Sequence, residues 1–234
     1  MGFFILAKKI TFGFPVETAM FKSKKDTVYV VLAGIFITNA VVAELIGGKL
    51  IHVGSAVMSV GILPWPVVFI TTDLINEYFG EKGVKRLSII TACLIAYCFI
   101  VLYAALKIPA VEGKDLVTDL QFTAVFGQSM WIIVGSITAF LVSQVIDVTI
   151  FHFVKKKTGE KKIWLRSTGS TVISQLFDSF IVLGIAFWMT GKMTTEVYIL
   201  SAFTGYSVKL IIAVLLTPLI YGGHAIIEKY ISEK

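Results

Sequence analysis

Two acidic residues, Asp147 and Asp178, each lie inside a long apolar run, and each ends the same short pattern. The pattern is Ser-Gln-x-x-Asp, and it occupies residues 143–147 and 174–178. On a helix the three polar side chains of each copy share one face, because residues three and four apart are neighbours. A carboxylate near the middle of a membrane helix costs about 2.5–3.5 kcal/mol on insertion scales, so such residues by default indicate function. The two copies therefore predict a polar site between helices, as in a carrier of a polar solute.

The composition indicates that this chain has lipid as its solvent. Of 234 residues, 56% are hydrophobic and 15% are charged, whereas a soluble domain carries about 25% charged residues. The net charge of +6 comes from basic residues at the ends of apolar runs, a pattern of membrane orientation rather than of nucleic-acid binding. His52, His152 and His224 are scattered without metal-ligand spacing, so we expect neither a metal nor a cofactor.

Six apolar segments are long enough to cross about 30 Å of hydrocarbon. They lie near residues 27–47, 51–75, 87–107, 124–153, 165–190 and 196–227. Basic residues concentrate before the first segment and in every second connection, which places both termini in the cytoplasm. We predict an all-α integral membrane protein with six transmembrane helices that form a single domain at 27–234. Residues 1–26 form a basic N-terminal arm, cytoplasmic or lying on the membrane surface.

A third ionisable residue, Lys209, reaches a depth in the sixth segment similar to that of the two acids. A salt bridge of Lys209 with Asp147 or Asp178, which only fixes helix packing, is the alternative to a binding role. Two carboxylates against one lysine leave a negative charge unbalanced. A proton, or a cationic or donor-rich substrate, can supply the balance.

Other polar and aromatic residues belong to the candidate site. Asp73, Asn76 and Glu77 share one helical face, which is more order than a cytoplasmic turn requires. The prolines of Pro64-Trp65-Pro66 remove two backbone donors, so we expect either a helix break that lines a cavity or a packed kink. The Trp65 ring is suited to stacking on a flat ligand.

Three stretches of the chain resemble the motifs of the queuosine precursor transporter family, once called putative vitamin uptake transporters. They are Phe69–Gly80, Thr38-Asn39 with Lys49, and 164–178, which contains the second Ser-Gln-x-x-Asp copy. The resemblance covers roughly residues 28 to 225. It implies a multi-pass importer in the inner membrane that carries 7-deazaguanines, such as the 7-cyano or 7-aminomethyl compound, for tRNA modification and salvage.

The predicted site suits such a substrate. A 7-deazaguanine is flat, and its ring N–H and exocyclic amine lie side by side, so that one carboxylate can accept from both. We expect Asp178 to be this acceptor, with Asp147 or Glu77 nearby, Gln144 or Gln175 on the remaining edges, and aromatic faces over the ring. The predicted substrate-binding residues are Asp178, Gln175, Asp147, Gln144, Asn39, Asp73, Asn76, Glu77, Trp65 and Lys209.

Two other classes of protein compete with a secondary carrier. One is the substrate-binding membrane subunit of an ATP-driven vitamin-type uptake complex; the chain lacks a Gly-x-x-x-x-Gly-Lys-Ser/Thr loop and cannot hydrolyse ATP itself. The other is an intramembrane aspartyl protease, which needs a Gly-rich turn before one Asp, whereas Ile146 and Phe177 precede these two. We expect a carrier, not an enzyme. Its partners are then a small molecule and the bilayer, with no nucleic acid, and a homodimer is left open.

Overall fold

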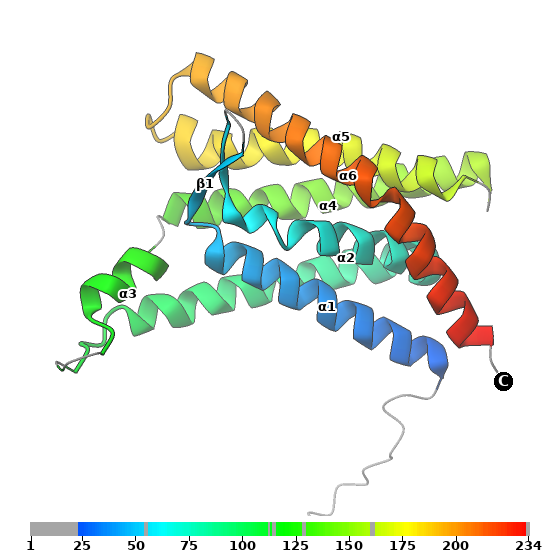
Figure 1. The fold of residues 1–234 in the computed structure, drawn as a ribbon, viewed down its shortest axis with the longest axis horizontal. Coiled ribbons are helices and arrows are strands. Elements are labelled where there is room, and N and C mark those ends of the chain that lie inside the picture. Colours follow the sequence, from blue (N-terminus) through cyan, green and yellow to red (C-terminus); the bar gives the residue numbers. More distant parts are fainter. Residues whose placement is uncertain are drawn as a thin grey trace, which may run out of the picture.

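The structure, a computed structural model, describes residues 23–53, 56–111, 113, 116–127, 130–159 and 162–232. It is built almost entirely from helices (Figure 1). In chain order the elements are α1 (Lys24–Ile46), β1 (Leu50–Val53), β2 (Ala56–Ser59), the short 3-10 helix η2 (Val60–Ile62), α2 (Trp65–Ala105), α3 (Asp119–Phe126), α4 (Met130–Thr158), α5 (Ile163–Leu183), the π-helix η3 (Gly184–Trp188) and α6 (Thr195–Ser232). Most of the predicted arm 1–26 lies outside the described residues, and residues 24–26 belong to the first turn of α1.

Five helical stretches of the described chain are long and apolar enough to cross a membrane. One of them, Val60–Ala105, has 46 residues and would be about 69 Å long if straight, more than twice the hydrocarbon thickness. It is not straight, because Gly80 interrupts α2 with φ 72° and ψ −178°, a conformation that only glycine adopts readily. Figure 1 shows the chain reversing its direction within α2, so the two arms form a helical hairpin.

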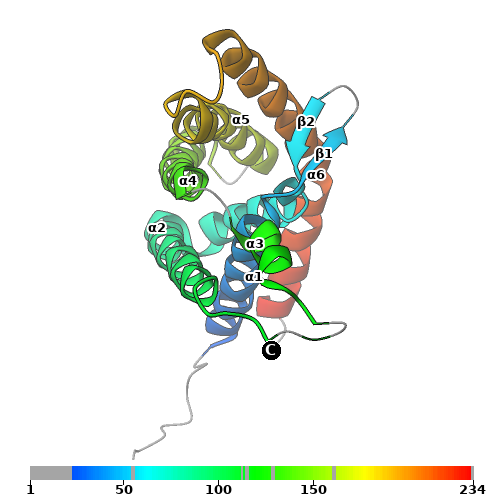
Figure 2. The ribbon, with the colours of Figure 1, turned by 90° about the vertical axis from the view of Figure 1, so that its left-hand side faces the viewer.

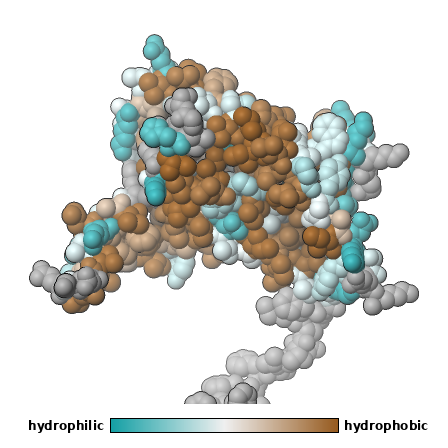
Figure 3. Space-filling model, viewed as in Figure 1, coloured by the Kyte–Doolittle hydropathy of each residue, from teal (hydrophilic) through white to brown (hydrophobic). Residues whose placement is uncertain are grey.

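The helices pack around one apolar core. α4 lies between α2 and α5 (Figure 2), while α1 packs on α2 and α6 packs on α5. Phe36 of α1, Ile75 and Ile95 of α2, and Phe140 and Val148 of α4 are fully or almost fully buried in this core. The outer surface is also apolar: a broad hydrophobic area covers the middle of the face in Figure 3, with hydrophilic residues toward its edges. Such a surface is stable only against lipid, so the fold is that of a multi-pass membrane protein.

The segment before α2 corrects the predicted second span at 51–75. Residues 50–53 and 56–59 form an antiparallel β-hairpin in which Leu50 pairs with Ser59, and the helix begins only at Trp65. The hairpin is attached to the end of α1, since the Ser59 hydroxyl donates to the Gly47 carbonyl at 2.7 Å. The following Gly61 approaches α1 so closely that a Cβ there would lie 2.7 Å from the Ala43 carbonyl oxygen.

The expected helix break at Pro64-Trp65-Pro66 is wrong. Pro64 is the N-cap residue of α2, and Pro66 lies in its first turn. The backbone N–H groups of a first turn have no intrahelical acceptor, so prolines there remove nothing and their fixed φ favours the helix. The prolines therefore start this helix. A proline inside a helix is found instead at Pro218 of α6, which changes direction along its length in Figure 1.

Candidate functional site

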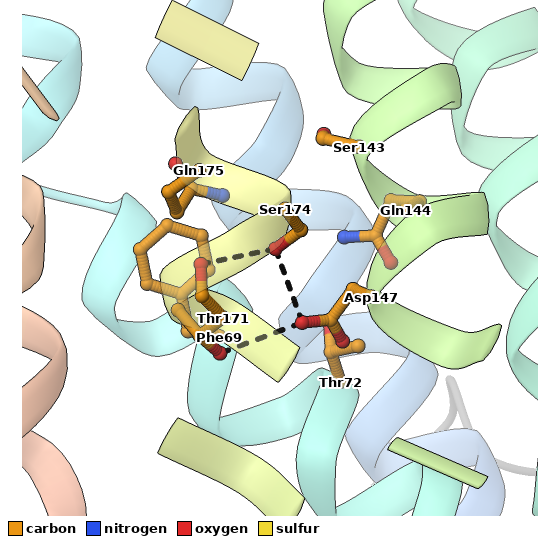
Figure 4. Close-up of a pocket in the computed structure, with 8 residues that line it drawn as sticks. All are labelled: Phe69, Thr72, Ser143, Gln144, Asp147, Thr171, Ser174 and Gln175. Carbon is orange, nitrogen blue, oxygen red and sulfur yellow. Dashed lines mark hydrogen bonds between the residues drawn. The ribbon is translucent and has the colours of Figure 1, made fainter. Parts of the chain in front are cut away.

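A small polar cavity lies between α2, α4 and α5 (Figure 4). Its volume is about 10 Å³, room for about one water molecule. Its lining consists of Phe69 and Thr72 from α2, Ser143, Gln144 and Asp147 from α4, and Thr171, Ser174 and Gln175 from α5. All eight side chains are buried, and seven of them are polar. Buried polar groups without a ligand are costly in an apolar bundle, so this concentration indicates a binding site.

Asp147 is the acid of this cavity. The Ser174 hydroxyl donates to its Oδ1 at 3.2 Å, and the Thr171 hydroxyl approaches the same oxygen at 3.5 Å (Figure 4). Both donors come from α5, one helical turn apart, and they orient the carboxylate toward the cavity. Among the described residues no basic side chain forms an ion pair with Asp147. The buried carboxylate is thus hydrogen-bonded but has no neutralising partner.

Two glutamines face the acid from both helices. Gln144 comes from α4 and Gln175 from α5, and Figure 4 shows the amide nitrogen of Gln144 directed into the cavity. Its oxygen is occupied on the other side by the Ser88 hydroxyl of α2, at 3.5 Å. An amide offers two donors and an acceptor, so the pair can bind the remaining edges of a planar polar ligand.

The aromatic wall of the cavity is Phe69, not Trp65. Trp65 stacks on Phe69 with centroids 5.9 Å apart and also lies 6.0 Å from Phe140. Trp65 is therefore placed behind Phe69, where it supports this ring, and it does not line the cavity. Phe69 is one helical turn after Trp65 and is the first residue of the motif at 69–80, which was the signal that the prediction missed.

A charged cluster lies next to the cavity, closer to the end of the bundle that carries Gly80. Glu77 accepts from Arg166 at 2.8 Å and from Lys155 at 3.1 Å, both at Oε1. The Arg166 side chain is 0% exposed. It also donates to the Gly159 carbonyl at 2.9 Å, so it ties α5 to the end of α4. The predicted common face of Asp73, Asn76 and Glu77 is confirmed, since all three point into the bundle.

Several polar atoms of this cluster have no hydrogen-bond partner in the described chain. They are Oδ1 of Asp73, both amide atoms of Asn76 and Oε2 of Glu77. Oδ2 of Asp73 accepts a short hydrogen bond from the Ser167 hydroxyl. A second cavity, with a volume of about 10 Å³, adjoins these groups. It is lined by Asp73, Leu74, Glu77, Phe151, Ile163, Ser167, Ile220 and His224.

Asp178 and Lys209 form an ion pair between α5 and α6. The salt bridge considered as an alternative is thus present for Asp178, and it is absent for Asp147. Asp178 does not line the cavity, although it was expected to be the central acceptor. Because α4 and α5 are antiparallel, Asp147 lies opposite Thr171 and Ser174, and Asp178 lies farther along the bundle. Asn39 is also outside the cavity, and its amide donates to the Ile35 carbonyl of its own helix at 2.8 Å.

The helices and the buried polar cavity define a class of protein, a multi-pass membrane transporter. The family model described as "Putative vitamin uptake transporter" matches residues 59–223, and the chain belongs to this family. This confirms the family resemblance found in the sequence.

Curated relatives support the same assignment. The chain is 26% identical over 181 residues to a probable queuosine precursor transporter of Bacillus subtilis (strain 168), covering 76% of this chain and 77% of the relative. It is 26% identical over 166 residues to one from Haemophilus influenzae, with 69% and 66% covered. It is 24% identical over 166 residues to the queuosine precursor transporter of Escherichia coli (strain K12), with 69% and 70% covered. No solved structure matches the chain.

Proposed function

We propose that this protein is a secondary carrier that imports 7-deazaguanine precursors of queuosine across the cell membrane. The observation that carries the proposal is Asp147, a buried carboxylate without an ionic partner that faces a cavity lined by hydroxyl and amide groups. The names of the relatives supply the class of compound. In this conformation the cavity has a volume of about 10 Å³, room for about one water molecule, so a bicyclic base can enter only after the surrounding helices move apart.

The cavity offers each edge of such a base a partner. One carboxylate accepts both the ring N–H and the exocyclic amine, and two parallel charge-assisted hydrogen bonds give strong and geometrically specific binding. In this proposal Asp147 takes the role that the sequence assigned to Asp178. Gln144 and Gln175 bind the other polar edge, and Phe69 covers the ring face. The absence of an ion pair at Asp147 favours the cationic 7-aminomethyl compound over the neutral 7-cyano compound, because the cation adds the missing charge.

The decisive test of transport uses the purified chain in liposomes without any ATP-hydrolysing partner. We expect labelled 7-cyano- or 7-aminomethyl-7-deazaguanine to enter these vesicles and to exchange with unlabelled compound inside. Exchange needs only a functional carrier. If neither compound exchanges until a nucleotide-hydrolysing complex is added, the protein is a subunit of an ATP-driven system and the carrier proposal is rejected.

Competition experiments test whether a carboxylate binds the donor edge of the base. We expect both 7-deazaguanines to compete with labelled precursor, while adenine in a 100-fold excess leaves uptake within twofold of the uncompeted rate. Adenine lacks the adjacent ring N–H and amine donors, so it cannot form the paired hydrogen bonds to a carboxylate. Guanine has the same donor edge and serves as the control for it. Inhibition by adenine as strong as that by the 7-deazaguanines would show that no carboxylate reads this edge.

We further propose six membrane crossings, with the two arms of α2 crossing separately and both termini in the cytoplasm. The Gly80 reversal supports this count. In Figure 1 the start of α1, the reversal within α2, the end of α4, the start of α5 and the end of α6 lie at one end of the bundle. The concentrated basic residues lie in or beside these regions of the sequence. The basic arm at 1–26 would then lie on the cytoplasmic side.

Cysteine labelling tests this topology in a background without Cys93 and Cys98. Val111→Cys should react with a membrane-impermeant maleimide in intact cells, because the connection between α2 and α3 faces outward in the proposal. Lys156→Cys, near the end of α4, should react only after the cells are permeabilised. Both positions are exposed in the structure, so access depends on the side of the membrane. The reverse labelling pattern would rule out the proposed orientation.

A further inference from the structure

The second cavity is lined by Asp73, a buried acid that forms no ion pair among the described residues. Asp73 is 4% exposed, and the Oδ1 atom of its carboxylate has no hydrogen-bond partner among the described residues. Its other oxygen accepts from a neutral hydroxyl, that of Ser167. The nearby basic side chains, Arg166 and Lys155, both donate to Glu77 Oε1, and Arg166 also donates to the Gly159 carbonyl. A buried carboxylate without an ionic partner costs several kcal/mol, so this arrangement is stable only when something neutralises it.

The groups that surround Asp73 come from every helix packed around it. They are Glu77 on α2, Asp147 and Lys155 on α4, Arg166 on α5 and His224 on α6. Asp147 lines the adjoining cavity, and its negative charge repels that of Asp73. Two neighbouring buried carboxylates are not both ionised at low cost, and one of them takes up a proton. If Asp147 must stay ionised to accept the donors of a base, Asp73 is the acid that is neutralised.

A proton fits the second cavity better than a metal cation does. Five of the eight lining residues, Leu74, Phe151, Ile163, Ile220 and the ring of His224, offer no oxygen from their side chains. No group of three or more metal-binding side chains exists in the described chain. A sodium or larger cation needs several oxygen ligands, whereas a proton needs one oxygen.

The two cavities are joined through neighbouring residues of the same helices. On α2, Thr72 lines the first cavity and Asp73 the second. On α5, Thr171 lines the first cavity and Ser167, one turn earlier, lines the second. A shift of either helix therefore alters both cavities at once. Such a shared element is what is needed for binding at one site to influence binding at the other.

We propose that Asp73 is the proton-coupling site of this carrier, separate from the substrate cavity at Asp147. A proton from the external water binds Asp73 Oδ1, the base binds to ionised Asp147, and both are released to the cytoplasm. The loss of charge on Asp73 removes the repulsion on Asp147, so proton and base favour each other's binding. The proposal rests on the proposed function, and a proton gradient is then the energy source for accumulation.

The test compares Asp73→Asn with the wild-type protein in liposomes, with labelled 7-cyano-7-deazaguanine as the neutral probe. The wild type should accumulate the compound when the outside is more acidic than the inside, and a sodium gradient alone should not drive accumulation. A pH-sensitive dye in the lumen should report acidification that requires the substrate. In Asp73→Asn, gradient-driven accumulation should fall by about tenfold or more. The variant should still exchange labelled for unlabelled compound, because exchange requires no net proton movement.

The matched control is Glu81→Gln, which removes an acid from the same helical hairpin at an exposed ion pair with Lys85. It should accumulate the probe like the wild type. Accumulation by Asp73→Asn equal to that of the wild type, or accumulation driven by sodium instead of protons, would overturn the coupling site.

An infrared titration of the purified protein tests, without any substrate, whether Asp73 binds a proton. A protonated carboxyl group absorbs at a different frequency from a carboxylate. The pH-dependent carboxyl band should lose a component in Asp73→Asn and keep it in Glu81→Gln; an unchanged band in Asp73→Asn would refute the proton site. If the wild-type protein exchanges no 7-deazaguanine, the proposed substrate is wrong. The infrared titration would still show whether Asp73 binds a proton.

Discussion

Replacing Asp147 with Asn should reduce the initial rate of 7-deazaguanine uptake by about 100-fold or more while the protein still inserts and folds. The amide keeps the volume of the carboxylate but presents a donor to the donor edge of the base. A hydrogen bond to a charged group contributes about 1.5–3 kcal/mol, and each 1.4 kcal/mol is a factor of ten. Loss of one such bond and weakening of the other therefore accounts for this factor.

Uptake of labelled precursor into cells that lack their own importer measures this effect. Glu196→Gln is the matched control, because Glu196 is an exposed acid in the first turn of α6, far from the cavity lining. Its uptake should match that of the wild type. Asp147→Asn should be present in the membrane at a similar amount. If it transports at more than about half the wild-type rate, the cavity at Asp147 does not bind the base edge, and the proposed recognition is wrong.

Replacing Arg166 with Met should destabilise the protein by about 3–5 kcal/mol, the usual cost of removing one partner of a buried ion pair. Arg166 is 0% exposed and the Glu77 side chain is 8% exposed, so water cannot replace the lost guanidinium. The substitution also removes the donor to the Gly159 carbonyl. Thermal unfolding of the detergent-purified protein, followed by intrinsic fluorescence, measures the loss.

The second variant, Glu77→Gln with Arg166→Met, separates buried charge from lost packing. If the Glu77 charge, left with the partly exposed Lys155 as its partner, causes the loss, the double variant should recover more than half of it, because the buried Glu77 side chain is then neutral. Lys85→Met is the control. It breaks an exposed ion pair with Glu81 at 2.5 Å and should cost no more than about 1 kcal/mol. A double variant as unstable as Arg166→Met would show that shape, and not charge, makes Arg166 necessary.

The β-hairpin shows where a prediction from hydropathy reaches its limit. Residues 51–75 are mostly apolar, and apolarity alone does not separate a short buried strand from the start of a helix. The hairpin is fixed by tertiary contacts. Ser59 donates to the carbonyl of Gly47, and the Val60 backbone N–H donates to the Lys49 carbonyl at 2.8 Å. Once the chain has turned back at residue 59, Pro64 and Pro66 can only begin a helix.

The sequence by itself determined the membrane class, the approximate helices and the polar faces of α2, α4 and α5. These properties are local, because they follow from apolar length, from the spacing of three and four residues and from the positions of basic residues. Of the residues in the paired Ser-Gln-x-x-Asp pattern, the structure brings Gln144, Asp147 and Gln175 to one cavity and leaves Asp178 outside it. The family resemblance came from the same local motifs, and the match at 59–223 confirms it.

The tertiary structure alone decided which of the two equivalent acids faces the cavity. The two copies of the pattern are alike in sequence, so nothing local distinguishes Asp147 from Asp178. The antiparallel offset between α4 and α5 sets Asp147 opposite Thr171 and Ser174, whereas packing of α6 brings Lys209 to Asp178. The offset between α4 and α5 and the choice of ion-pair partner both depend on how whole helices pack against each other. No short window of sequence specifies this packing.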